Sequence, residues 1–217
     1  YVADVGPEAA DLHVWFEADL LPGYVWSFPL PGRRANVGFG VLRGGRVAIG
    51  DTGRIWIELL DRPGIRGVLG DDAVAEGRHA AWPIPARVNR SVLDHGPVLF
   101  TGDAASATDA LTGEGIGQAL LTGALAAESI LTGGTPEVIG SRYRRAVRRE
   151  LVADHRMSAL LQRVMAYPPA AGTTLALAGL TGWTRRNFAR WLFEDYPRAL
   201  VATPRRWRPG ALGRPGA

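Results

Sequence analysis

A carboxylate and a run of glycines, placed between two apolar segments, are the residues best suited to chemistry in this chain of 217 residues. The first apolar segment, 98–101, predicts a short buried strand, and Gly102 and Asp103 follow it directly. A glycine-rich turn spans 111–116, and the alanine- and leucine-rich composition of 118–131 predicts a helix. A helix that begins after such a turn presents free backbone N–H groups and the positive end of its dipole to a ligand.

These groups indicate the kind of ligand that would bind. The carboxylate of Asp103 has the wrong charge for a phosphate, but it can accept hydrogen bonds from the hydroxyl groups of a polyol. The N–H groups of the turn suit an anionic or carbonyl-bearing group. A flavin nucleotide carries both, so the motif predicts a flavin site. The alternative, an ordinary Gly-Asp turn with no ligand, stays open because short glycine motifs are weak signals.

The ordered string of residues is more specific than its parts. It resembles the second flavin-binding motif of FAD-dependent oxidoreductases that share the para-hydroxybenzoate hydroxylase fold, through Gly-Asp-Ala-Ala at 102–105 and Gly-Glu-Gly-Ile at 113–116. Those proteins carry a proline before the glycine pair, whereas Ala110 takes that place here, after Asp109. The resemblance implies that FAD contacts Gly102, Asp103, Gly113, Glu114, Gly115 and Ile116. Asp103 would bond the ribityl chain, and the turn amides would face the pyrimidine end of the reduced ring.

A second pattern lies near the start of the chain. Segments 24–29 and 35–42, joined by a turn, predict a β-hairpin. Side chains of a strand alternate between its two faces, so Tyr24, Trp26 and Phe28 share one face and form what we call the aromatic wall. From the pattern alone, the aromatic wall is either a ligand-binding surface or one face of the hydrophobic core.

The hairpin resembles the geranylgeranyl reductase family of FAD-dependent oxidoreductases, which carry a Tyr-x-Trp-x-Phe-Pro string and a following Asn-Val-Gly strand. The matching residues are Pro22-Gly23-Tyr24-x-Trp26-x-Phe28-Pro29 and Ala35-Asn36-Val37-Gly38-x-Gly40. In that family the string lines the cavity that holds an isoprenoid chain near the flavin ring. The resemblance therefore implies that the aromatic wall of Tyr24, Trp26 and Phe28 binds the substrate.

The resemblance also implies the fold class and the domains. We expect an α+β chain that forms the C-terminal portion of a two-domain FAD-binding fold of the para-hydroxybenzoate hydroxylase type. Residues 1–86 would be the rest of a substrate domain with an antiparallel sheet, 87–137 the C-terminal part of the FAD-binding domain, and 138–217 a helical region with a basic tail. The strand–GxGxxG–helix unit that holds the ADP half of FAD is missing, so we expect a fragment.

The remaining segments predict one more strand, helices and loops. A strand is expected over 11–19, a helix over 55–69 and a loop over 70–77. The prolines of 81–85 argue against a central strand there. A long helix is expected over 141–165, with its many arginines facing solvent.

Composition excludes several classes of function. The chain has no cysteine, and its four histidines lack metal-ligand spacing, so we expect no disulfide, no thiol catalysis and no metal. It has no nucleic-acid-binding motif. The apolar stretch 170–183 is too short to span a bilayer, which needs about 20 residues. Aromatic residues mixed with arginines over 183–193 predict either a helix at a membrane surface or a packed helix. We expect a cytoplasmic protein, with peripheral membrane contact left open.

The function that the resemblance implies is FAD-dependent reduction of carbon–carbon double bonds in a polyprenyl, geranylgeranyl-type chain on a lipid or quinone such as menaquinone. NAD(P)H or another reductant would supply the electrons. The residues assign no catalytic proton donor, although Glu114 lies closest to the flavin turn in sequence. Two alternatives remain: a flavin-dependent monooxygenase of the same fold, and a non-catalytic lipid-binding or interaction module.

Overall fold

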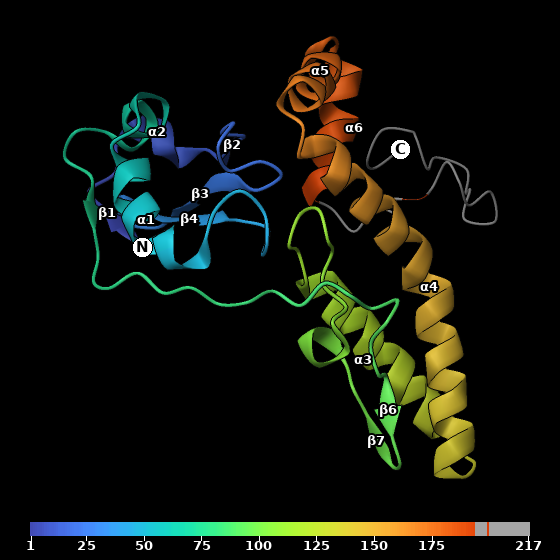
Figure 1. Cartoon of the computed structure of the whole chain (residues 1–217). Coiled ribbons are helices and arrows are strands. Elements are labelled where there is room, and N and C mark those ends of the chain that lie inside the picture. The colour runs from blue at the N-terminus through green and yellow to red at the C-terminus, as the bar shows by residue number, and fades with distance from the viewer. Residues whose placement is uncertain (194–198, 200–217) are drawn as a thin grey trace. The chain divides into compact units, whose positions relative to one another are not determined.

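The computed structural model describes residues 1–193 and Ala199. The chain divides into two compact units. One, here called the sheet unit, comprises Tyr1–Trp82 together with Met165–Pro168, and the other, the helical unit, comprises the remaining described residues. The sheet unit is a β-sheet with helices on one face, and the helical unit consists mostly of helices (Figure 1). The expected α+β class is thus confirmed, while the expected boundaries after residues 86 and 137 stay predictions.

The sheet unit contains a five-stranded antiparallel sheet in the order β2-β3-β4-β1-β5. β3 (Tyr24–Leu30) and β4 (Arg34–Gly40) pair along their whole length and form the predicted hairpin. β2 (His13–Trp15) pairs with β3 on the outer side of the hairpin. β1 (Val2–Ala3) and β5 (Val74–Ala75) complete the sheet beyond β4.

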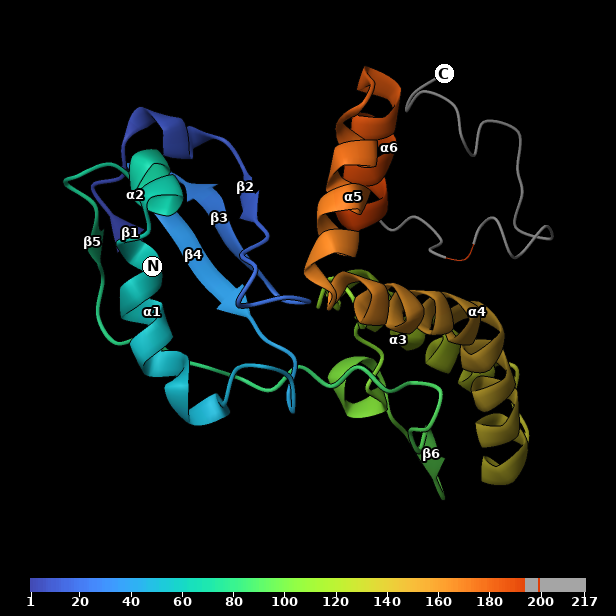
Figure 2. The same ribbon diagram turned by 45° about the horizontal axis from the view of Figure 1, so that its top comes forward.

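Two α-helices cover one face of this sheet, α1 (Thr52–Leu60) and α2 (Pro63–Leu69) (Figures 1 and 2). Short 3-10 turns lie at Pro7–Ala10 and Ile49–Asp51. Alternate residues of β3 and β4 point at the helices, and their burial removes apolar surface from water. The buried core consists of Val2, Val5, Ala9, Leu20, Val25, Ala35, Val37, Ile55, Leu59, Ile65, Leu69 and Ala73.

The helical segment expected over 55–69 is confirmed in part, because it forms two helices, α1 and α2, with a break between them. Arg62 has extended backbone angles (φ −64°, ψ 132°) and Pro63 follows it. A proline clashes with a helical conformation of the residue before it, so one helix ends and another begins there.

The strand predictions near both sheet edges are also corrected. The strand expected over 11–19 is limited to β2, because the chain turns at Glu17, whose carbonyl accepts from the N–H of Leu20 at 2.9 Å. The loop expected over 70–77 contains β5, which pairs with β1. These edge strands have three residues (β2) and two residues (β5), too few for a hydrophobic alternation to be visible.

The helical unit begins with a small hairpin of β6 (Asp94–His95) and β7 (Val98–Leu99), followed by a 3-10 turn at Gly102–Ala105. The strand expected over 98–101 is confirmed in part: β7 lies within this range, but it has only two residues, β6 is its one partner in the described chain, and Val98 is 51% exposed rather than buried. The helices that follow are α3 (Ile116–Leu131), α4 (Pro136–Met165), α5 (Pro168–Gly179) and α6 (Gly182–Phe193).

The long helix α4 packs against α3 through a stripe at four-residue spacing. Tyr143, Val147 and Leu151 are buried in a cluster that includes Leu125 and Ala126 of α3. This helix starts five residues earlier than expected, because Pro136 fits the first turn of a helix, where no N–H donor is needed.

Not all arginines of α4 face solvent, which corrects that expectation in part. The guanidinium of Arg142 donates to the carbonyl oxygens of Ser129 (2.7 Å) and Gly133 (3.1 Å), and so satisfies acceptors at the C-terminal end of α3. Arg144 forms an ion pair with Asp94 of β6. Arg145 and Arg148 are exposed as expected.

Among the described residues, no helix combines the length and the hydropathy that crossing a bilayer would require. The apolar stretch 170–183 is divided between α5 and α6. The basic tail that follows Phe193 lies outside the described residues, apart from Ala199.

Candidate functional site

The Gly-Asp pair of the helical unit is held tightly against α3. Gly102 has a positive φ of +53°, a conformation that favours glycine, and its N–H donates to Oγ1 of Thr122 at 2.9 Å. A Cβ at this position would lie 3.1 Å from the Cβ of Ala119. Sequence reasoning missed Thr122, which holds the backbone beside Asp103 from the second turn of α3.

The carboxylate of Asp103 is exposed and lies near the glycine turn, residues 111–116. Its Oδ1 accepts a hydrogen bond from Oγ1 of Thr108 at 3.0 Å. The same Oγ1 lies 3.1 Å from the point where Gly115 would carry a Cβ. Thr108 therefore brings the carboxylate and the glycine pair together, although twelve residues separate them in sequence. Asp103 forms no ion pair with any described residue.

The amides of the glycine turn differ in their availability. The N–H of Gly113 donates to the carbonyl of Asp109 at 3.1 Å, so this predicted flavin contact is already engaged. The amides of Gly115 and Ile116 have no hydrogen-bond partner among residues 1–193 and 199. Because they open the 16-residue helix α3, they combine free donors with the positive end of a helix dipole.

The side chain of Glu114 bonds the first turn of α3. Its Oε1 accepts from the N–H of Gly117 at 3.0 Å, and its own N–H donates to Oγ1 of Thr112 at 3.2 Å. A carboxylate in the first turn of a helix satisfies a free amide and interacts favourably with the dipole. This contact accounts for Glu114 without a role as a proton donor.

The residue that shapes the turn is Asp109, which sequence reasoning noted only as the neighbour of a missing proline. Its carboxylate is 7% exposed and accepts from the N–H groups of Leu111 (3.0 Å) and Thr112 (2.9 Å). Aspartate bonded to amides two and three residues on is a known turn device, so the Asp-x-x-Thr pattern was a usable signal.

The linker between the units joins the helical unit beside this turn. Ala86 forms an isolated antiparallel bridge with Ala107, and the N–H of Arg87 donates to the carbonyl of Ser106 at 3.0 Å. The side chain of Ile84 comes within 3.5 Å of the Cβ position of Gly113. An apolar side chain thus borders the glycine turn.

The aromatic wall lies in the sheet unit, on the face of β3 opposite the helices. Neighbouring rings follow one another along the strand, with centroids 6.0 Å apart for Tyr24 and Trp26 and 6.2 Å for Trp26 and Phe28. The buried Val25 points the other way, into the core. The wall is partly exposed rather than a core face, and substrate binding to it stays a prediction.

Asn36 and Gly38 of β4 hold the central ring. The indole N–H of Trp26 donates to Oδ1 of Asn36 at 3.1 Å, which satisfies its one polar group. The ring lies over Gly38, where a Cβ would come within 2.3 Å of it. The Asn-Val-Gly string therefore has a physical role: one residue orients the ring, and the other leaves room for it.

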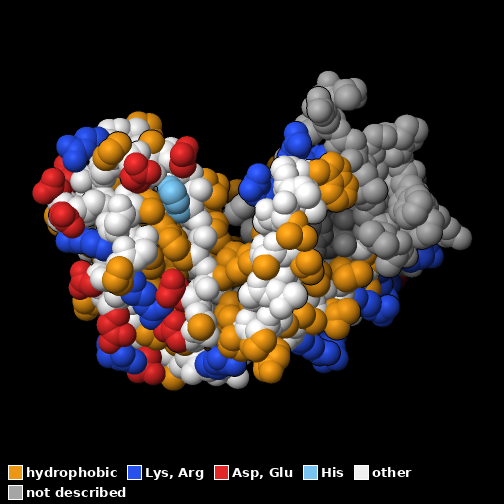
Figure 3. All heavy atoms as spheres, turned by 90° about the horizontal axis from the view of Figure 1, so that it is seen from above, with side chains coloured by type: hydrophobic (Ala, Val, Ile, Leu, Met, Phe, Trp, Pro, Cys, Tyr) orange, Lys and Arg blue, Asp and Glu red, His pale blue; other side chains and the backbone are white. Residues whose placement is uncertain are grey.

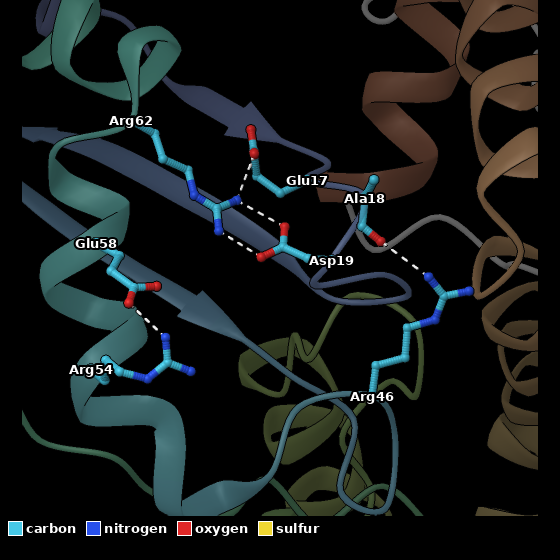
Figure 4. A network of polar contacts seen from close by, with 7 residues as sticks. All are labelled: Glu17, Ala18, Asp19, Arg46, Arg54, Glu58 and Arg62. Atoms are coloured by element: carbon cyan, nitrogen blue, oxygen red, sulfur yellow. Dashed lines mark hydrogen bonds and ion pairs between the residues drawn. The ribbon is translucent and has the colours of Figure 1, made fainter.

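An arginine anchors the loop that leads into the wall. Arg62, between α1 and α2, bonds Glu17 (2.6 Å) and both carboxylate oxygens of Asp19 (2.9 and 2.6 Å) (Figure 4). The hydrogen bond from Arg62 lowers the pKa of Asp19, and partial burial opposes that shift. These bonds hold the loop between β2 and β3 to the helices. Phe16 at the start of this loop and Tyr24 at the start of β3 have ring centroids 5.9 Å apart.

No group of three or more histidine, aspartate or glutamate side chains within the described part of the chain is arranged to hold a metal ion.

Comparison with known proteins identifies similar sequences that are named reductases. No protein-family model matches the chain. A digeranylgeranylglycerophospholipid reductase 2 from Methanopyrus kandleri is 34% identical over 118 residues, which cover 54% of this chain and 29% of that protein. A menaquinone reductase from Mycolicibacterium smegmatis is 34% identical over 126 residues, 56% of this chain and 29% of that protein. The chain thus spans less than a third of the length of these relatives.

A solved structure is similar over most of the chain. It is the crystal structure of a geranylgeranyl bacteriochlorophyll reductase-like protein from Thermoplasma acidophilum, with a TM-score of 0.59 and 16% sequence identity. The match covers 93% of this chain and 52% of that one, and it shows a shared fold. The resemblance to geranylgeranyl reductases that the two sequence motifs predict is confirmed by these relatives.

Proposed function

We propose that the chain is the C-terminal part of an FAD-dependent reductase that saturates carbon–carbon double bonds of a polyprenyl, geranylgeranyl-type chain carried on a lipid or quinone. One observation carries the proposal: Thr108 joins the exposed carboxylate of Asp103 to the glycine pair, next to the free amides of Gly115 and Ile116. The names of the similar proteins favour reduction over the oxygen-dependent chemistry of a flavin monooxygenase, and over a non-catalytic module.

These residues fit the two ends of the isoalloxazine and ribityl part of FAD. The carboxylate of Asp103 would accept hydrogen bonds from the ribityl hydroxyl groups. The amides of Gly115 and Ile116 would donate to the pyrimidine end and stabilise negative charge there. A Cβ at position 115 would lie 3.1 Å from Oγ1 of Thr108, so a side chain there would press on the residue that holds Asp103.

The chemistry divides between the cofactor and the chain. FAD, when bound, would supply hydride transfer to one alkene carbon, with a proton added to the other and with NAD(P)H or another donor as the source of electrons. The aromatic wall of Tyr24, Trp26 and Phe28 would hold the prenyl chain through apolar contact and so select which double bond reacts. We assign no proton donor. Glu114, the residue closest to the flavin turn in sequence, is engaged by the N–H of Gly117 at the start of α3.

The outward face of α3 supports the view that more protein packs here. Ile116 and Leu120 are 77% and 72% exposed on this helix, and Leu131 at its end is exposed too. Contiguous exposed apolar surface of this kind marks an interaction site. We infer that the nucleotide-binding part of the flavin domain covers this face, in keeping with a match to only half of the Thermoplasma acidophilum chain.

A peripheral contact with a membrane would suit a lipid substrate. α6 carries the exposed Trp183 together with the exposed Arg185 and Arg186. Basic side chains lie next to hydrophobic ones on the surface of the helical unit (Figure 3). We propose that this part of α6 rests on an anionic lipid surface, with the aromatic residue at the headgroup level.

The decisive test is flavin binding by the full-length protein. Asp103→Ala removes charge-assisted hydrogen bonds, so FAD should bind at least about tenfold more weakly, as measured by fluorescence titration of the apoprotein. Asp72→Ala, at an exposed aspartate of the sheet unit, is the matched control and should bind as the parent does. Anaerobic saturation of a geranylgeranyl lipid by the dithionite-reduced protein would support the reaction. Wild-type protein without flavin affinity, or product that forms only with oxygen, would overturn it.

A further inference from the structure

A buried carboxylate links the glycine turn to helix α4. One oxygen of Asp109 accepts from the N–H groups of Leu111 and Thr112 and from the Thr112 hydroxyl, at 3.0, 2.9 and 3.1 Å. The other oxygen accepts from the hydroxyl of Ser158 on α4 at 2.6 Å. All four of these partners donate, so the two carboxylate oxygens act only as acceptors and satisfy every one of them.

The backbone closes around the same residue. The N–H of Asp109 donates to the carbonyl of Glu114 at 2.8 Å, and its carbonyl accepts from Gly113 at 3.1 Å. The side-chain amide of Gln162 donates to the carbonyl of Ala110. Ser158 and Gln162 are one helical turn apart, so a single face of α4 holds the start of the turn at two points.

These bonds fix the backbone that leads into Gly115 and Ile116. Because residues 109–114 are bonded to one another and to α4, the following amides of Gly115 and Ile116 are presented from a fixed backbone. In the related motif a proline stiffens this position, whereas here Ala110 leaves the backbone dihedral free. The carboxylate of Asp109 supplies the constraint instead.

We propose that Asp109, held by Ser158, is a positioning residue for the flavin: it fixes the glycine turn in the form in which the Gly115 and Ile116 amides receive the cofactor. This inference rests on the proposed function, because it concerns the affinity for FAD. Asp109 acts through the backbone and touches neither substrate nor reacting atoms. Preorganised donors of this kind gain affinity because their ordering cost is met before binding.

The experiment compares two buried serines of the helical unit in the full-length protein. Ser158→Ala removes the hydroxyl that bonds Asp109, whereas Ser129→Ala removes one that bonds only the carbonyl of Leu125 within α3, at 2.7 Å. Both serines are buried, so the two variants lose a similar hydroxyl from the interior. Ser158→Ala should bind FAD about tenfold more weakly, and Ser129→Ala within about twofold of the parent.

Two further measurements separate positioning from general damage. Asp109→Asn keeps an amide oxygen that can accept from the Leu111 and Thr112 N–H groups, so it should recover most of the affinity that Asp109→Ala loses. Hydrogen exchange of those two amides, in the protein without FAD, should be at least about tenfold faster in Ser158→Ala than in Ser129→Ala.

The outcomes are distinct. A wild-type protein that binds no FAD overturns the proposed function and this inference with it. A wild-type protein that binds FAD while Ser158→Ala and Ser129→Ala bind it equally overturns the positioning role alone. If Asp109→Ala does not fold, the serine pair and the exchange rates still decide the question.

Discussion

Position 38 needs glycine for a reason that lies in the neighbouring strand. A Cβ there would come within 2.3 Å of the Trp26 ring, whereas a Cβ on Gly40, two residues along the same face, would meet nothing within 4 Å. Gly38→Ala should therefore displace the central ring of the aromatic wall. If the wall binds the prenyl chain, KM for a long prenyl substrate should rise roughly tenfold, with FAD affinity unchanged.

Gly40→Ala is the control, because it makes the same chemical change on the same strand without a clash. Near-ultraviolet circular dichroism, which reports the packing of tryptophan rings, should change in Gly38→Ala and not in Gly40→Ala, even before a substrate is added. Equal spectra would show that the ring is not confined by this glycine. Changed spectra with equal KM values would remove the wall from substrate binding.

Residues of the candidate site differ in how far sequence could predict them. Strand alternation is local, so it placed Tyr24, Trp26 and Phe28 on one face correctly. Asp109 was underrated because part of its environment comes from Ser158, 49 residues further along the chain. A hydrogen-bond partner so far along the chain leaves no local pattern in the sequence. The absence of a proline at Ala110 does not by itself indicate that the carboxylate of Asp109 constrains the turn instead.

Among the secondary-structure elements, α4 is joined to the strand region before Gly102 by the phenol of Tyr143. Tyr143 is fully buried, and its hydroxyl donates to the carbonyl of Phe100 at 2.5 Å. This bond ties α4 to the backbone that leads into Gly102. Tyr143→Phe keeps the ring but leaves the carbonyl without its donor, so the free energy of unfolding should fall by about 1–2 kcal/mol at neutral pH, measured by urea denaturation.

The contribution of Tyr143 to the free energy of unfolding should also depend on pH in the alkaline range. Burial raises the pKa of Tyr143 to about 12, while a tyrosine in the unfolded chain titrates near 10. A raised pKa means that the contribution to stability is complete below about pH 10 and is lost as pH rises through about 12. The stability difference between wild type and Tyr143→Phe should therefore shrink over that range. Tyr167→Phe, at an exposed tyrosine, should follow the wild type throughout.

Elements bounded by proline and glycine were predictable, and short strands were not. The helix expected over 118–131 ends at Leu131 as predicted, and Gly133 and Gly134 follow before α4 begins at Pro136. Pro63 carried the same kind of signal, but the helical spacing on both sides of it concealed the break. A two-residue strand such as β7 is a strand only because it pairs with β6. The composition of one segment does not show which segment it will pair with.

At the scale of the whole molecule, the division into two units separates the two halves of the proposed function. The aromatic wall belongs to the sheet unit, and the groups that we propose contact the flavin belong to the helical unit. Each was predictable by itself, because each rests on a contiguous string of residues. The exposed apolar face of α3 was not expected, since alanine and leucine in a helix pattern suggest burial on both sides.

The proposed membrane contact also belongs to the whole molecule, because it combines a net charge of +4 with one exposed end of the helical unit. α6 begins after a reciprocal cap, in which Thr181 and Thr184 exchange backbone-to-hydroxyl bonds of 2.9 and 3.0 Å. This cap orders the turn that exposes Trp183, next to Arg185 and Arg186. A lipid surface with negative charge would attract such an end by about 1 kcal/mol for each arginine.

Reversing both charges in the full-length protein, with Arg185→Glu and Arg186→Glu, should therefore weaken binding to vesicles of mixed phosphatidylglycerol and phosphatidylcholine by at least about tenfold, measured by co-sedimentation. Arg145→Glu with Arg148→Glu changes the net charge equally on the exposed face of α4 and should have a much smaller effect. Binding should also fall as salt is added, because screening weakens the attraction. Equal losses in both double variants would mean that overall charge, and not the end of α6, directs the protein to the surface.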